Sequence, residues 1–162
     1  RQILLQDDFD NGVMDGNIIN AGYESAFVGL SEPNGFLLLK RGGEHSIVRP
    51  RTREITVDTD KKVVIEFSSL LNSSSGCQYA KLVLLNTQYS QYIICRKNCN
   101  VPEEVKIIWD MKNGVLQCFI NGELLATAEG ELYKSFDRVV QFDFLCYQFL
   151  KWQIDNLLIW QE

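Results

Sequence analysis

Short runs of apolar and β-branched residues recur along the chain, separated by Gly, Asn, Asp and Ser. Their spacing of roughly 8–12 residues is typical of the strands of an all-β sandwich or barrel. Residues 129–136, EGELYKSF, could form only a turn of helix. The pattern predicts strands at 22–30, 35–41, 45–50, 53–58, 61–71, 80–86, 91–96, 104–112, 115–120, 123–128, 138–149 and 152–160.

Two of the Asn-Gly pairs, at 113–114 and 121–122, lie between strand-like runs. Asn-Gly supports a positive φ at both central residues of a tight hairpin turn. Residues 104–128 are therefore predicted to form a three-stranded meander. No repeat or linker divides the chain, so we expect residues 1–162 to be a single domain, a two-sheet antiparallel β-sandwich.

Composition and charge exclude some classes of function. The formal net charge of -5 gives the whole molecule no electrostatic attraction to nucleic acid or to an anionic membrane. No apolar run approaches the roughly 18 residues of a membrane-spanning helix, so membrane insertion is not expected.

The chain has five cysteines, Cys77, Cys95, Cys99, Cys118 and Cys146. The first three lie on two strand-like runs joined by a short turn, which predicts a disulfide from Cys77 to Cys95 or to Cys99. Cys118 and Cys146 would then be apart or in a separate bridge. With the acceptor sequon Asn72-Ser73-Ser74, this favours an extracellular or secretory protein over a cytosolic one with buried thiols.

Four segments, in this order, resemble the concanavalin A-like jelly-roll superfamily: DDFD, NGFLLLKRGG, VKIIWDMKNGVLQCFINGELLA and FDRVVQFDF…WQIDNLLIW. That group includes laminin-G-like domains, carbohydrate-binding modules and laminarinase-type glucanases. The resemblance spans Asp7 to Trp160 and implies a concanavalin A-like jelly roll.

The acid in WQIDNLLIW, Asp155, needs a partner because an isolated carboxylate inside an apolar strand is costly. The resemblance implies a structural calcium ion shared by Asp155 and by Asp8 or Asp10 of DDFD, since calcium prefers oxygen ligands. In the alternative, Asp155 accepts hydrogen bonds from backbone N–H groups of a neighbouring loop. Either arrangement would tie the last strand to the DDFD segment.

The catalytic strand of the glucanase relatives carries an E-x-D-x-E pattern, which places carboxylates on one face of a strand. This sequence has no such pattern, and its single histidine, His45, lies in a Gly-Gly-Glu segment. Glu66 and Asp143 are single acids inside strands and are the alternative candidates for a catalytic pair. We therefore expect a non-catalytic module, with a glycoside hydrolase or polysaccharide lyase as the alternative.

Relatives without the catalytic strand are usually recognition modules, which implies a glycan or glycoprotein ligand or, alternatively, a purely structural protein-interaction role. Such sites combine aromatic faces with amides and acids. The candidates are Gln117, Gln141 and Asp143 on strand faces, with Trp152 and Tyr147 flanking a loop. Trp109 and Trp160 are predicted to fill the core.

Arg49, Arg51 and Arg53 alternate in IVRPRTR, so an extended backbone would place all three on one face. Such a stripe could bind a sulfated glycan or an acidic partner. The alternative is that arginines and Pro50 protect an edge strand from aggregation.

Overall fold

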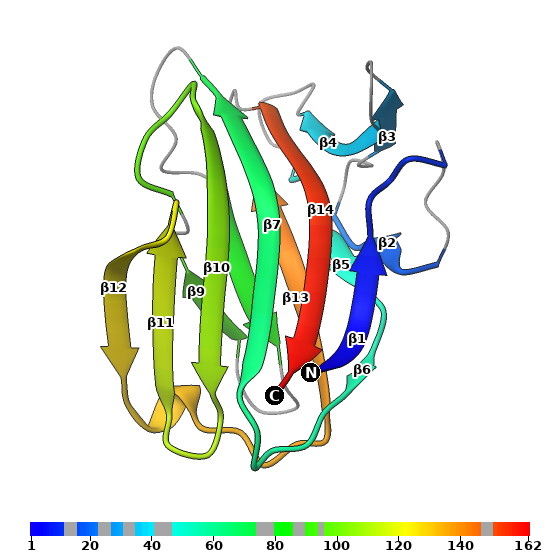
Figure 1. The fold of residues 1–162 in the computed structure, drawn as a ribbon. Helices are drawn as coiled ribbons and strands as arrows, with labels where there is room; N and C mark the ends of the chain where they lie inside the picture. The colour runs from blue at the N-terminus through cyan, green and yellow to red at the C-terminus, as the bar shows by residue number, and fades with distance from the viewer. Residues whose placement is uncertain are drawn as a thin grey trace.

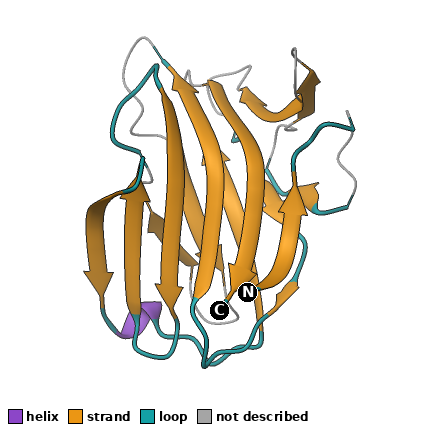
Figure 2. Ribbon diagram, viewed as in Figure 1, coloured by secondary structure: helices purple, strands orange, loops and turns teal. Residues whose placement is uncertain are grey.

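The computed structural model of the protein describes residues 1–11, 16–22, 27–30, 35–40, 47–73, 80–85, 90–93, 96–146 and 151–162. Across these residues strands dominate, and helix is limited to the 3-10 turn Glu131–Tyr133 (Figure 2). The strands form two antiparallel sheets, one stacked behind the other (Figure 1). This confirms the predicted all-β sandwich of two antiparallel sheets.

The larger sheet contains the two terminal strands, which pair with each other. β1 (Gln2–Asp7) places Gln2 opposite Gln161 of β14 (Lys151–Gln161), so the chain termini lie side by side (Figure 1). The order in this eight-stranded sheet is β12 (Glu123–Glu129), β11 (Val115–Ile120), β10 (Pro102–Asp110), β7 (Val63–Asn72), β14, β4 (Gly35–Lys40) and β3 (Phe27–Leu30), with β1 also on β14.

The smaller sheet has six strands, with β13 near its centre. Its order is β2 (Ile18–Asn20), β5 (Pro50–Thr52), β13 (Val139–Cys146), β8 (Ala80–Leu85) and β9 (Ser90–Ile93), with β6 (Ile55–Thr56) also on β13. β5 pairs with β2 on one side and with β13 on the other. The prediction that arginines protect an edge strand here is therefore wrong.

The predicted meander is confirmed as β10, β11 and β12. The turn between β11 and β12 has φ values of 51° at Asn121 and 84° at Gly122. Positive φ at both positions matches the right-handed twist of the flanking strands, and Asn and Gly tolerate it best. The Asn121 carboxamide also accepts a 2.8 Å hydrogen bond from the backbone N–H of Glu104, which fixes this turn against β10.

Alternation along the strands directs one set of side chains into a core between the sheets. Phe67 and Trp152 of the larger sheet meet Phe144 of the smaller sheet edge to face, with ring centroids 5.2 and 5.6 Å from Phe144. Trp109 lies in the same core, as predicted. Trp160 does not: it is half-buried on the outer face of the larger sheet, where its Nε1 donates to Glu66.

Cys118 and Cys146 are buried and form no disulfide, which was one of the two alternatives. Burial, with a smaller effect of the Glu103 charge, raises the pKa of the Cys118 thiol to about 11. Cys77 and Cys95 lie outside the described residues.

Candidate functional site

The predicted ligand-binding residues lie in three different environments. Gln117 projects from β11 on the outer face of the larger sheet, because its neighbours Leu116 and Cys118 are in the core. Gln141 and Asp143 project from β13 on the outer face of the smaller sheet, because Phe142 and Phe144 are in the core. The whole core therefore separates Gln117 from the other two.

The aromatic part of that prediction does not fit the structure. Trp152 is fully buried, and its Nε1 donates a 2.8 Å hydrogen bond to the Ser69 hydroxyl. A ring packed on both faces cannot stack on a ligand, so Trp152 is a core residue. Tyr147 lies outside the described residues.

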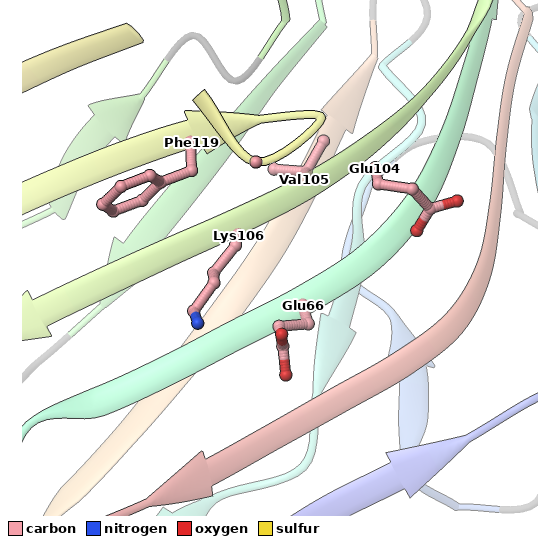
Figure 3. A pocket seen from close by; sticks show the side chains of 6 residues that line it. Glu66, Glu104, Val105, Lys106 and Phe119 are labelled. Carbon is pink, nitrogen blue, oxygen red and sulfur yellow. The ribbon is translucent and has the colours of Figure 1, made fainter. Parts of the chain in front are cut away.

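The outer face of the larger sheet has a groove, lined by Glu66, Glu104, Val105, Lys106, Phe119 and Gly122, with a volume of ≈ 350 Å³. Strand register places Glu66 of β7 opposite Lys106 of β10, and Lys106 opposite Phe119 of β11. Three neighbouring strands thus present an acid, a base and an aromatic ring in one row across the sheet (Figure 3).

The two carboxylates of the groove are held by neighbouring donors. Glu66 accepts a 2.8 Å bond from Trp160 Nε1, and Glu104 accepts bonds of 2.8 and 3.0 Å from the Ser68 hydroxyl. Each donor fixes its carboxylate and leaves further lone pairs free to accept hydrogen bonds from a ligand hydroxyl. Phe119 is only half-buried, so part of its ring is open to solvent.

The alternative catalytic pair is contradicted by the topology. Glu66 projects from the outer face of the larger sheet and lines the groove, whereas Asp143 projects from the outer face of the smaller sheet. Two carboxylates on opposite outer faces of a sandwich cannot flank one glycosidic bond, which requires them within about 10 Å. The second acid in the groove is Glu104, which the sequence did not single out.

Asp143 is fully buried and binds two arginines. Arg49 Nε donates to its Oδ2, while Arg51 donates from Nε to Oδ1 at 2.7 Å and from Nη2 to Oδ2 at 3.0 Å. These hydrogen bonds raise the pKa of Arg51 above its usual value, although burial alone would lower it. Asp143 therefore has no exposed oxygen for a ligand, and its predicted direct role in binding is not supported.

The predicted arginine stripe is divided by the structure. Arg49 and Arg51 share the Asp143 carboxylate, whereas Arg53 donates to the Asn17 side chain and to the carbonyls of Glu54 and Leu4. Gln141, on the same face as Asp143, donates from Nε2 to the Thr52 carbonyl.

Asp155 lies at a β-bulge where β14 loses register with β7 between Asp155 and Leu158. Asn156 adopts a φ of 50° there, a left-handed conformation that Asn tolerates better than most residues. The extra residue rotates the strand locally, so Asn156 is exposed and Asp155 is only partly buried. The bulge explains how an acid is accommodated in an otherwise apolar strand.

The structure does bring Asp155 close to the DDFD segment. Burial raises the pKa of Asp155, and the negative charges of Asp10, Asp8 and Glu104 raise it as well. The Asn156 N–H donates a 2.8 Å hydrogen bond to Asp155 Oδ1 and lowers this pKa. The hydrogen bond is local, so the predicted bonds from a neighbouring loop are wrong for the described part of the chain.

The other two acids of the expected calcium site accept hydrogen bonds from backbone N–H groups. Asp8 accepts from the Asp10 N–H at 3.1 Å, and Asp10 accepts from the Gly35 N–H at 2.9 Å. Over the described ranges, no group of three His, Cys, Asp or Glu side chains is arranged to hold a metal ion. The calcium site therefore stays a prediction, and the pairing of β1 with β14 already holds the terminal strands together.

No protein-family model matches the sequence, and no curated protein matches it. Solved structures do match the fold. Lectin II from Ulex europaeus is 13% identical, with a TM-score of 0.67 and 98% of each chain covered. The binding domain of botulinum neurotoxin DC in complex with SialylT is 12% identical, with a TM-score of 0.64. A sialidase is 10% identical, with a TM-score of 0.65.

The protein spans 48% of that neurotoxin chain and 18% of the sialidase chain, while 98% of its own length is covered in both comparisons. At these identities the likeness establishes the fold, a concanavalin A-like sandwich shared with legume lectins. A search of the described residues finds no helix long and apolar enough to cross a membrane.

Proposed function

We propose that residues 1–162 act as a single, non-catalytic module that binds a glycan, free or on a glycoprotein, through the groove on the larger sheet. The observation that carries this proposal is the row of Glu66, Lys106 and Phe119 across three adjacent strands of an outer face. The similarity in fold to a lectin and to a neurotoxin binding domain supports the same class of function.

The chemistry of the groove suits a sugar. A pyranose ring has apolar C–H faces that pack on an aromatic ring, and hydroxyls that require both donors and acceptors. Phe119 supplies the ring, Glu66 and Glu104 supply acceptors, and Lys106 supplies donors. Gln117 lies two residues from Phe119 on the same face of β11 and extends the polar rim, which retains one predicted ligand-binding residue.

A glycan array followed by titration calorimetry on the best ligand tests this proposal. Phe119→Ala should weaken binding about tenfold, the effect of losing one aromatic contact of about 1.4 kcal/mol. Lys106→Met should weaken it through lost hydrogen bonds while keeping most of the apolar stem. Phe136→Ala is the matched control, because Phe136 is 78% exposed and does not line the groove.

Equal affinity of wild type, Phe119→Ala and Lys106→Met, each shown to be folded by circular dichroism, would overturn the assignment of the groove. If no glycan on the array binds and the protein forms a stable complex with another protein, the protein-interaction alternative is favoured.

Hydrolysis is the second candidate function, because Glu66 and Glu104 both reach the groove. Turnover of a polysaccharide that Glu66→Gln abolishes would establish an enzyme in place of a binding module.

We extend the proposal to a secreted or cell-surface protein in which Cys77 is bridged to Cys99. In support, Cys99 is disulfide-bonded, while Cys118 and Cys146 form no disulfide. Disulfides persist mainly in oxidising compartments. Peptide mapping without reductant should find the Cys77–Cys99 peptide; free thiol at all five positions would contradict both the bridge and the location.

A further inference from the structure

The Asp143 cluster, made of Arg49, Arg51 and Asp143, carries more positive charge than it neutralises. One buried carboxylate faces two guanidinium groups, whose side chains are 23% and 29% exposed. Because arginine stays protonated, the cluster keeps a net charge of about +1. It lies on the outer face of the smaller sheet, away from the groove of the larger sheet.

Several donors of the cluster have no acceptor in the described part of the chain. Asp143 uses only Nε of Arg49, and Nε and Nη2 of Arg51. The two Nη groups of Arg49 and Nη1 of Arg51 therefore remain available. Arg53 differs, because its Nε, Nη1 and Nη2 all donate to oxygens of the chain. Because both side chains are partly exposed, these donors can reach a ligand, and an anion would accept charge-assisted hydrogen bonds from them.

Strand register shows on which side the cluster is open. Asp143 pairs with Val83 of β8 on one side and with Arg51 of β5 on the other, and Arg51 pairs with Ile19 of β2. Val83 is fully buried, whereas Ile19 is 49% exposed. The cluster is thus closed toward β8 and open toward β2, where Ile19 offers an apolar surface.

Gln141 completes the set of groups. Its Nε2 is held by the Thr52 carbonyl, which fixes the amide and leaves Oε1 as an acceptor on the same face of β13 as Asp143, two residues along the strand. A planar cationic donor, an amide acceptor and an apolar side chain match an acidic sugar, which has a carboxylate or sulfate, hydroxyls and an apolar ring face.

We propose that Arg49, with Arg51, Gln141 and Ile19, forms a second binding site for the carboxylate or sulfate group of an acidic sugar. Asp143 positions both guanidinium groups and does not touch the ligand. The site is independent of the groove on the larger sheet. Since the whole protein carries a net charge of -5, binding there depends on local geometry and not on overall attraction to anions.

Calorimetry with sialyllactose, lactose sulfate and lactose as probes tests the proposal. Arg49→Gln should weaken the two charged sugars about tenfold or more and leave lactose unchanged, because one charged, two-pronged contact is removed. Arg53→Gln is the matched control: it removes the same charge nearby, from a guanidinium already bound to the chain, and should not alter affinity. Sialyllactose and lactose sulfate distinguish a carboxylate site from a sulfate site.

If Arg49→Gln is poorly folded, NMR titration of the wild type with the better charged sugar replaces it, and the amides of Ile19 and Gln141 should shift. Equal binding of charged and neutral sugars, an equal loss in Arg53→Gln, or shifts confined to the groove would overturn this site and leave the proposed function intact. Conversely, the groove variants could leave the affinity for lactose unchanged while Arg49→Gln weakens binding of the charged sugars. That result would refute the groove and support this site.

Discussion

Replacing Asp143 by Ala should destabilise the protein strongly, because Asp143 pairs with two arginines. Its carboxylate is fully buried on the outer face of the smaller sheet and accepts three hydrogen bonds from Arg49 and Arg51. The substitution leaves two like charges side by side without the anion between them. It also removes the side-chain ion pair between β13 and β5, leaving the hydrogen bonds from Gln141 and Phe142 to Thr52.

The magnitude follows from burial. Removing one partner of a buried ion pair costs roughly 3–5 kcal/mol, because the remaining charge loses its compensation. Here the remaining side chains are 23% and 29% exposed, so both guanidinium groups can regain water. We therefore expect the lower end of that range, about 3 kcal/mol in the free energy of unfolding.

Equilibrium unfolding in urea measures this change as a lower midpoint at an unchanged slope. Asp60→Ala is the matched control: Asp60 accepts from Lys112 at 3.2 Å, but both side chains are well exposed. Such a pair is worth about 0.2–1 kcal/mol. If Asp143→Ala costs no more than Asp60→Ala, the cluster does not stabilise the fold and the reasoning is wrong.

Three further predictions concern the terminal segments and the core. Gly35→Ala should lower the free energy of unfolding by about 1–3 kcal/mol, because a Cβ there would lie 2.2 Å from the Phe9 carbonyl oxygen. Unfolding in urea measures this change, and an unchanged midpoint would contradict that packing. Burial and nearby acids raise the pKa of Asp155 in the folded state. Protonated Asp155 therefore stabilises the fold at a pH below its unfolded-state pKa, and this stabilisation is lost as the pH rises through its folded-state pKa. Asp155→Asn should therefore raise the melting temperature at neutral pH, with the gain vanishing in acid; a lower melting temperature together with a calcium response lost in the variant would instead establish the calcium site. The Cys118 thiol, with a pKa of about 11, should resist iodoacetamide at pH ~8 until the protein is denatured, and rapid labelling of the native protein would contradict its burial.

Local signals in the sequence determined the strands and the meander. Alternation places Phe67 and Ile65 on one face of β7 whatever lies opposite, and Asn121-Gly122 supports its own turn. These features depend on neighbouring residues and on backbone sterics, so the fold class was predictable. The DDFD segment and Asp155 were also correctly placed near each other, because the terminal strands pair.

Contacts between distant segments decided the rest. Trp152 and Trp160 alternate with apolar residues in the same strand, yet Trp152 meets Phe144 in the core and Trp160 reaches Glu66 on the surface, because the bulge at Asp155 shifts the parity between them. Arg49 and Asp143 are 94 residues apart, and they meet because Val48 pairs with Cys146 and β5 pairs with β13. A residue's face follows from its own strand, but its partner depends on which strands become neighbours and in what register.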